Sequence, residues 1–420
     1  MESLIELHLK TAESAYRTGK FAEAADAYAA VARLDPKNAA ALEYLGTIAL
    51  WNNQPDEALK FLKEALLHSK GVQRFWPFTA QIKVRMAMAH YRADRFPDAA
   101  KSFKEAAGPI VLGDFRQLKA LGDWLAAFGT APPCVVAGPA QARIPFVMTD
   151  PLPIVKVSIG DGPPLDFLID TGASEVVLDE QLAKHLGVPI AATMTGEFSG
   201  SKKATMGLGR VELLRLGEFA VGNVPINTLD LRSLSSVFGG LEIKGIIGTR
   251  FLMHFLSAMD YRSGALVLQQ GTSDQRKSLA SQPAKRIPFW LIDMHTILAR
   301  GTVNGLEPML FWIDTGLADN GFLPSPALLG KAGIEVDWSK AQEGVGGGGK
   351  VQEVPVVVDR LTLGVGDDEI VEENIPGIAQ EHPTGLGDHF GFEISGLISH
   401  RFFRNHTLTF DFESMHMILQ

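Results

Sequence analysis

The sequence predicts a multidomain protein in which an all-α repeat array precedes an all-β region built from two similar lobes. Residues 5–107 are rich in alanine, leucine, glutamate and lysine, with apolar residues at helical spacing. After residue 142 the apolar residues alternate as in strands, and one series of landmarks occurs twice in the same order. We place the helical domain at residues 1–129, a linker at 130–142, the first lobe at 143–270, an inter-lobe linker at 271–283 and the second lobe at 284–420.

Length, composition and charge limit the class of protein. A chain of 420 residues, of which 46% are hydrophobic and 21% charged, is typical of a soluble globular protein with more than one core. The net charge of −9 argues against a nucleic-acid partner, which requires a basic face. Cys134 is the only cysteine, so no internal disulfide can form.

The N-terminus and the hydropathy pattern bear on localisation. No apolar run approaches the roughly 18 residues that a membrane span needs. Residues 1–6 lack the basic and apolar segments of a signal peptide. We therefore expect a cytoplasmic protein from the chain as given, and a periplasmic or secreted one if the natural N-terminus lies upstream.

A recurrence of 34 residues runs through the helical region. Ala24 and Tyr28 are followed 34 residues later by Ala58 and Leu62. The other matching positions are Gly19, Phe21, Pro36, Leu45, Gly46, Phe96, Ala99, Phe103 and Ala106. This pattern resembles the tetratricopeptide repeat, with three units and a capping helix at about residues 110–128. The resemblance implies a concave face that binds a peptide or partner protein. A rigid spacer is the alternative, because no cluster of basic or aromatic residues in the sequence indicates a ligand.

Three landmarks of the β-rich region occur twice. Arg143–Phe146 recurs as Arg286–Phe289. The segment that ends in Asp170-Thr171-Gly172 recurs as the segment that ends in Asp314-Thr315-Gly316. Further on, residues 245–252 recur as residues 396–403. The offsets are 143, 144 and 151 residues, so the order is kept with a short insertion in the second copy. We infer a duplicated unit that brings two carboxyl groups together.

Each acidic tripeptide follows a predicted hairpin. In the first copy, strands at 154–159 and 165–169 deliver Asp170 to a loop, and a short helix is expected at 179–186. In the second copy, strands at 297–303 and 306–313 deliver Asp314, and Asn304-Gly305 between them is a strong hairpin signal.

With these motifs, residues 143–420 resemble an aspartic protease of the retropepsin or pepsin kind with both lobes on one chain. The resemblance implies that Asp170 and Asp314 meet at a pseudo-two-fold axis, share a proton and activate water. It implies a monomer that needs no metal or organic cofactor and acts on a peptide or protein substrate. It further implies supporting roles for Thr171, Gly172, Ala173, Thr315 and Gly316 in the catalytic loops, and for Ile247, Gly248, Ile398 and Ser399 in the apolar segments beside them.

Two departures from this family pattern bear on activity. Ala173 and Leu317 stand where pepsins have a hydroxyl residue, which donates to the acid and favours its charged form. We therefore expect an acid pair with less depressed pKa values and a working range that reaches towards neutral pH. Ser399 stands where the first copy has Gly248.

Glycine-rich segments in both copies are candidate flaps over a cleft. Gly196, Phe198 and Gly200 mark one, and Gly346 and Gly347 mark the other. Ordinary flexible turns are an equally good interpretation of both segments. The late histidines match no zinc-binding spacing.

The leading hypothesis is an aspartic endopeptidase with an N-terminal repeat array. The alternative is a catalytically weak or inactive peptide-binding module whose repeat array recruits a partner. A third possibility pairs each lobe with its copy from another chain.

Overall fold

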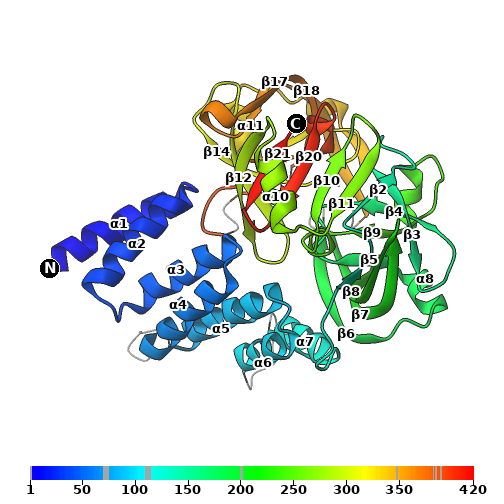
Figure 1. The fold of residues 1–420 in the computed structure, drawn as a ribbon. Helices are drawn as coiled ribbons and strands as arrows, with labels where there is room; N and C mark the ends of the chain where they lie inside the picture. The colour runs from blue at the N-terminus through cyan, green and yellow to red at the C-terminus, as the bar shows by residue number, and fades with distance from the viewer. Residues whose placement is uncertain are drawn as a thin grey trace. The chain divides into compact units, whose positions relative to one another are not determined.

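The computed structural model describes residues 2–69, 75–108, 115–198, 202–346, 349–381, 383, 386–387 and 390–420. The chain folds into two compact units. The first consists of Met1–Pro132 and two short segments from later in the chain, Leu291–Met294 and Asp388–Glu393. The second consists of Pro133–Trp290, His295–Gly387 and Ile394–Gln420. The predicted order, an all-α region followed by a β-rich region, is confirmed (Figure 1).

Helices that pack against their sequence neighbours make up the first unit. Their bounds are α1 Glu2–Arg17, α2 Phe21–Leu34, α3 Ala39–Trp51, α4 Pro55–His68, α5 Phe75–Arg92, α6 Phe96–Ala107 and α7 Phe115–Ala126. The predicted capping helix corresponds to α7, and its expected first residues, 110–114, lie outside the described residues. None of the helices in the described part of the chain is both long and apolar enough to cross a membrane.

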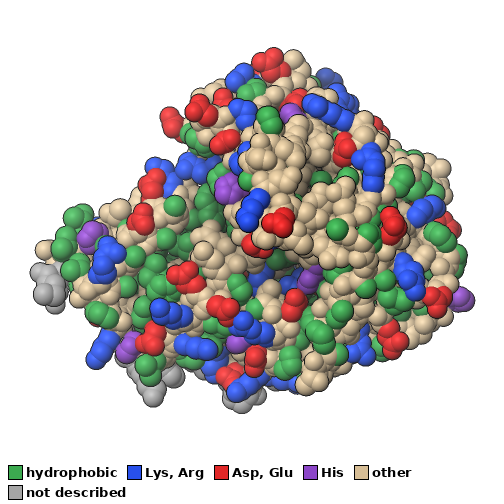
Figure 2. All heavy atoms as spheres, in the orientation of Figure 1, with side chains coloured by type: hydrophobic (Ala, Val, Ile, Leu, Met, Phe, Trp, Pro, Cys, Tyr) green, Lys and Arg blue, Asp and Glu red, His purple; other side chains and the backbone are tan. Residues whose placement is uncertain are grey.

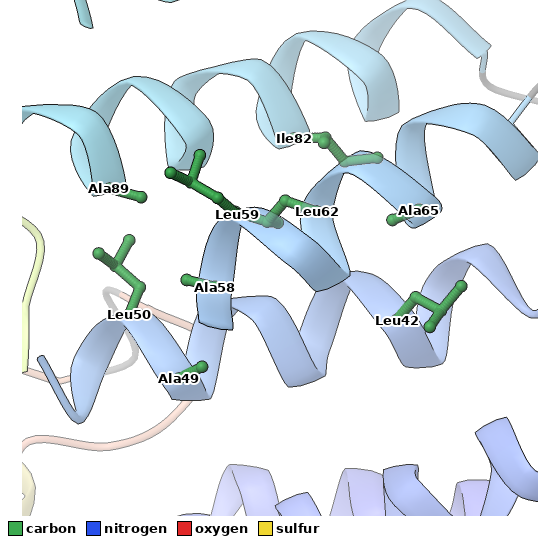
Figure 3. Close-up of a cluster of buried hydrophobic side chains, with 9 residues drawn as sticks. All are labelled: Leu42, Ala49, Leu50, Ala58, Leu59, Leu62, Ala65, Ile82 and Ala89. Atoms are coloured by element: carbon green, nitrogen blue, oxygen red, sulfur yellow. The ribbon is translucent and has the colours of Figure 1, made fainter. Parts of the chain in front are cut away.

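Small residues allow these helices to approach closely. A Cβ atom on Gly46 of α3 would lie 2.7 Å from the Leu62 side chain of α4, so only glycine fits there. A buried cluster between α3, α4 and α5 stabilises the packing (Figure 3). Its members are Leu42, Ala49, Leu50, Ala58, Leu59, Leu62, Ala65, Ile82 and Ala89. Ala58 and Leu62, the residues that first indicated the repeat, therefore belong to its core.

Two sheets form the second unit within the described residues. One has eight strands in the order β1-β8-β5-β9-β4-β3-β7-β6. Their bounds are β1 Val135–Ala137, β3 Ile154–Ile159, β4 Leu165–Ile169, β5 Val176–Asp179, β6 Ile190–Phe198, β7 Lys202–Leu216, β8 Phe219–Leu229 and β9 Ile243–Ile247.

The other sheet has thirteen strands within the described residues, in the order β16-β17-β18-β15-β19-β14-β13-β12-β21-β20-β10-β11-β2. Its strands are β2 Gln141–Pro145, β10 Leu256–Asp260, β11 Ala265–Gln269, β12 Lys285–Ile292, β13 Thr296–Val303, β14 Met309–Ile313, β15 Phe322–Pro324, β16 Gln342–Gly346, β17 Gly349–Leu363, β18 Ile370–Ala379, β19 Gly396–Ile398, β20 Thr407–Asp411 and β21 His416–Leu419.

Short α-helices are α8 Glu180–His185, α9 Thr249–Leu252, α10 Ser273–Ala280, α11 Pro326–Lys331 and α12 His400–Phe403. The 3₁₀ helices are η3 Arg232–Ser236, η4 Trp338–Lys340 and η5 Gly366–Asp368.

The same local strand arrangement occurs twice. Strand β4 pairs in parallel with β9, and β9 pairs antiparallel with β5. Likewise β14 pairs in parallel with β19, and β19 pairs antiparallel with β15. Each arrangement presents one Asp-Thr-Gly loop at the carboxyl end of its parallel pair. The lobe bounds given above remain a prediction.

The two segments that we interpreted as linkers contain regular structure. Segment 130–142 includes β1, which pairs with β8, and the first residues of β2. Segment 271–283 includes α10, whose first turn is closed by a capping box between Thr272 and Gln275. Helix α10 buries no side chain, which explains why its sequence shows no apolar periodicity.

Acidic and basic side chains are interspersed on the molecular face shown in Figure 2.

Candidate active site

The two aspartates that the sequence singled out begin two hydrogen-bonded loops. The backbone N–H of Asp170 donates to the Ile247 carbonyl at 3.1 Å, and that of Asp314 donates to the Ile398 carbonyl at 3.0 Å. Each aspartate is therefore fixed by the strand that runs parallel to its own. This is the physical reason why the apolar landmarks at 247 and 398 accompany the acidic tripeptides.

Two buried threonines join the loops reciprocally. The N–H of Thr171 donates to Thr315 Oγ1, and the N–H of Thr315 donates to Thr171 Oγ1, both at 3.0 Å. Thr171 Oγ1 in turn donates to the Ile313 carbonyl at 3.0 Å, and Thr315 Oγ1 donates to the Ile169 carbonyl at 3.5 Å. Both threonines are fully buried. Because a hydroxyl accepts and donates at once, each threonine satisfies two backbone groups of the other copy.

The glycines place each carboxyl group against the opposite loop. The Gly172 N–H donates to Asp170 Oδ1 at 2.7 Å, and the Gly316 N–H donates to Asp314 Oδ1 at 2.8 Å. A Cβ atom on Gly172 would lie 2.4 Å from Asp314 Oδ2, and one on Gly316 would lie 2.4 Å from the Asp170 carboxyl carbon. No residue with a side chain fits at either place, and the two carboxyl groups meet between the glycines.

Burial raises the pKa of both carboxyl groups. Burial and then the charge of Asp314 hold the pKa of Asp170 well above its ordinary range, against the Gly172 N–H, which lowers it. Burial likewise raises the pKa of Asp314, although hydrogen bonds from Asp170 and the glycine N–H groups act in the opposite direction. Two acids this close hold one proton between them, because ionising both is costly. The arrangement can therefore remove one proton and donate another in the same step.

The residue after the apolar pair beside each loop differs between the copies, with Gly248 in the first and Ser399 in the second. Ser399 is fully buried, accepts a hydrogen bond from the Leu317 N–H and donates one to the Leu317 carbonyl, both at 3.1 Å. A Cβ atom on Gly248 would instead lie 2.3 Å from the Glu175 carbonyl oxygen. Serine therefore fits only the second copy, where it holds the second Asp-Thr-Gly loop by its backbone. The Leu317 side chain packs against Leu323, Ile378 and Leu397 and offers no hydroxyl to the acids.

Comparisons with known proteins agree with this geometry in part. A family model described as Aspartyl protease matches residues 155–251, which include the first acidic loop. A second model, described as Tetratricopeptide repeat, matches residues 9–78. The chain therefore carries tetratricopeptide repeats and an aspartyl protease domain.

Solved structures that resemble parts of the chain have low overall similarity. A retropepsin-like aspartic protease from Rickettsia conorii is 15% identical, with 32% of this chain and 92% of that chain covered and a TM-score of 0.22. The N-terminal domain of stress-induced protein-1 (STI-1) from C. elegans is 16% identical, with 28% and 93% covered and a TM-score of 0.26. MamA protein is 17% identical, with 30% of this chain covered and a TM-score of 0.26, and the match spans 64% of the MamA chain. No curated protein matches the sequence.

The first candidate flap is the end of the β6–β7 hairpin of the aspartyl protease domain. Gly196 pairs with Ala204, and Phe198 pairs with Lys202. The Phe198 side chain packs against the apolar cluster that Ala173 also contacts, so this hairpin reaches the neighbourhood of the first Asp-Thr-Gly loop. Gly200 lies outside the described residues.

The second candidate flap is the β16–β17 hairpin. Gly346 pairs with Gly349 at its end, and Gly347 lies outside the described residues. Among the residues described, no group of three or more histidine, cysteine, aspartate or glutamate side chains is placed to hold a metal ion.

One supporting residue of the aspartyl protease domain was missed from the sequence. The buried Thr249 hydroxyl donates to the Thr171 carbonyl at 2.8 Å and so fixes the first loop from a third direction. The signal was available, because Thr249 directly follows Gly248 in a duplicated landmark. The second copy has His400 at the corresponding position, so comparison of the two copies did not indicate a role for the threonine.

Proposed function

We propose that this chain is an aspartic endopeptidase whose Asp170/Asp314 pair activates a water molecule against a peptide carbonyl. The observation that carries this proposal is the reciprocal bonding of Thr171 and Thr315, which holds the two carboxyl groups together from loops 144 residues apart. A duplicated domain that used its acids only to close turns would have no need to join the two turns through buried hydroxyl groups.

The proposed chemistry needs one proton on the pair. The ionised carboxylate takes a proton from water as the water oxygen attacks the peptide carbonyl. The protonated carboxyl donates to the carbonyl oxygen as the tetrahedral centre forms. When that centre collapses, the carboxyl that took the water proton donates it to the nitrogen of the leaving peptide as the C–N bond breaks. The other carboxylate recovers its proton from a hydroxyl of the tetrahedral centre. The raised pKa values favour the singly protonated pair in which both roles are filled.

We further propose that the site is completed within one chain, in a monomer with two lobes of the bounds given above. Both loops of the pair are present in one polypeptide at high effective concentration. The substrate is then an extended peptide that adds its backbone to strand edges beside the cleft. Activity per mole that does not change with protein concentration supports the in-chain arrangement, and activity that falls on dilution contradicts it.

Cleavage of casein by the full-length chain tests the proposal. Asp170→Asn and Asp314→Asn are each expected to abolish cleavage and to retain a cooperative unfolding transition. Asp161→Asn is the matched control, because the Asp161 side chain is 94% exposed and pairs with Arg215 instead of with a residue of either loop. A pepstatin-type inhibitor should block the same activity. Full cleavage by either catalytic-loop variant would contradict the mechanism.

A second candidate function is peptide binding without cleavage, and Leu317 is the residue that favours it. Its side chain is held in an apolar cluster where a hydroxyl donor would tune the acid pair. Under this candidate, casein peptides bind the unaltered chain and remain uncut over the whole pH range, and Leu317→Thr does not restore cleavage.

A further inference from the structure

An aromatic side chain from late in the sequence is seated among the repeat helices. Phe392, which is 2% exposed, belongs to the first unit with α1, α2 and α3. Its ring centroid lies 5.6 Å from that of Tyr16, 5.0 Å from Phe21 and 5.7 Å from Trp51, all in edge-to-face geometry. We call these three residues the aromatic seat. Such ring pairs contribute attraction beyond the apolar area that they bury.

The backbone and the neighbouring ring of the segment are also held. The Tyr16 hydroxyl donates to the Phe390 carbonyl at 3.4 Å. The Phe390 ring stacks on Phe392 at 5.7 Å and lines a cavity of about 290 Å³ that Trp51 and Arg85 also line. The segment therefore meets the helices as a short peptide does, through two aromatic side chains and a carbonyl group.

The segment is closed at its base by a separate pair of hydrogen bonds. The Gly387 N–H donates to the Ile394 carbonyl at 3.1 Å, and the Ile394 N–H donates to the Gly387 carbonyl at 3.0 Å. Gly387 and Ile394 thus fix the two ends of the segment that carries Phe390–Glu393. Gly391 at its turn has φ of 80°, a conformation that suits glycine.

We propose that Phe390–Glu393 is a built-in ligand of the repeat array, and that the array recognises peptides with the pattern Phe-Gly-Phe. An aromatic peptide is favoured as the ligand because Phe392 itself packs against the rings of the aromatic seat, which come from three different helices. Its tether supplies a high local concentration, so the array is occupied by its own chain before any partner arrives.

Occupation of the seat also bears on the second catalytic loop, a consequence that rests on the proposed function. Beyond Ile394, the Ser395 N–H donates to the Leu310 carbonyl at 2.9 Å, and Ile398 accepts the Asp314 N–H. Ile398 is only six positions after Phe392. Fixing the loop at Phe392 therefore restricts the strand that positions Asp314, and Phe392 acts as a positioning residue.

A fluorescent peptide with the sequence of residues 387–395 tests the proposal on the full-length chain. Phe392→Ala vacates the seat, whereas the unaltered chain fills it. If the segment occupies the seat for more than about nine-tenths of the time, the variant binds the peptide at least about tenfold more tightly than the unaltered chain. Fluorescence anisotropy over a protein titration up to millimolar concentration measures this ratio.

Controls distinguish binding at the aromatic seat from nonspecific hydrophobic binding of the peptide. A peptide that carries Phe392→Ala should not bind the variant, and adding Trp51→Ala to Phe392→Ala should abolish binding of the original peptide. Trp338→Ala is the matched aromatic control, because Trp338 is 42% exposed and lies in the second unit, so it should behave as the unaltered chain. Equal affinity of the unaltered chain and Phe392→Ala, or binding that survives the loss of the peptide phenylalanine, overturns the proposal.

Conservative variants cover the case in which Phe392→Ala does not melt cooperatively. Trp51→Phe and Phe392→Leu, alone and combined, form a cycle of urea midpoints. Non-additive shifts support direct recognition between the seat and the segment, and additive shifts overturn it.

Casein cleavage then tests the positioning role separately. We expect Phe392→Ala to lower kcat more than it raises KM, and the peptide added in trans to restore part of kcat. An active unaltered chain whose kcat survives Phe392→Ala overturns the positioning role. An inactive unaltered chain contradicts the proposed function and leaves the peptide-binding result intact.

Discussion

Removing the Thr171 hydroxyl should cost more stability than removing that of Thr315, although the two residues form a reciprocal pair. Valine has the shape of threonine, so Thr171→Val and Thr315→Val leave no cavity and change only the hydrogen bonds. Thr171 Oγ1 accepts from the Thr315 N–H and donates to the Ile313 carbonyl, both at 3.0 Å. Thr315 Oγ1 accepts from the Thr171 N–H at 3.0 Å, but its bond to the Ile169 carbonyl is 3.5 Å long.

The magnitudes follow from the number of buried groups that lose a partner. Each buried backbone group left without a hydrogen bond costs about 1–3 kcal/mol. Thr171→Val orphans one N–H and one well-bonded carbonyl and should lower the free energy of unfolding by about 2–6 kcal/mol. Thr315→Val orphans one N–H and a weakly bonded carbonyl and should lower it by about 1–3 kcal/mol.

Urea unfolding of the β-rich unit measures both values, because a shift of the midpoint at constant m-value reports stability alone. Thr171→Ser and Thr315→Ser are the controls, since serine keeps the hydroxyl and should retain most of the stability. Equal midpoints for Thr171→Val and Thr171→Ser would show that the hydroxyl does not satisfy the two backbone groups, and the reasoning would fail.

Three further predictions follow from the same structure. Burial raises the pKa of Asp170, so ionisation of the native pair opposes folding as pH rises above the ordinary aspartate pKa of about 3.9. Asp170→Asn should therefore stabilise the β-rich unit at neutral pH and lose this advantage below that pKa. Urea midpoints over a pH series measure the effect, and a stabilisation that is the same at all pH values contradicts the predicted sign. Gly248→Ser should impair folding because its Cβ would lie 2.3 Å from the Glu175 carbonyl oxygen. Ser399→Gly should lower the free energy of unfolding by only about 1–2 kcal/mol, because two hydrogen bonds are lost. Similar melting temperatures of the two variants would contradict this. Glu43→Ala should lower the stability of the helical unit by about 3 kcal/mol, because it removes the buried carboxylate that pairs with the partly buried Arg85. Glu180→Ala, which breaks an exposed pair with Lys184, should change stability by about 0.5 kcal/mol or less.

The sequence predicted the elements whose signals are local. Apolar spacing and the 34-residue recurrence located the helices, and Ala58 and Leu62 proved to be core residues of the array. The tripeptides at 170 and 314 lie at the ends of β4 and β14, as the alternating strands before them indicated. Local patterns sufficed here because helix and hairpin contacts join residues that are close in sequence.

Features that depend on distant partners could not be predicted in this way. Tyr16, Phe21 and Trp51 are scattered over three helices, so the sequence showed no aromatic cluster, yet they converge on Phe392. Ser399 departed from the glycine of the first copy, and only the position of the Leu317 backbone reveals the two bonds that it forms. In each case the decisive neighbour lies tens or hundreds of residues away, where periodicity carries no information.

The position of β21 has a consequence for biosynthesis. This strand, His416–Leu419, lies in the interior of the thirteen-stranded sheet, between β12 and β20. The helical unit is dominated by contacts between neighbouring helices and can begin to form while the ribosome is still translating. The sheet cannot close until residue 419 has left the exit tunnel, so β10, β12 and β20 remain unpaired on one side during synthesis. A chaperone that shields exposed strand edges would therefore be needed most in that interval.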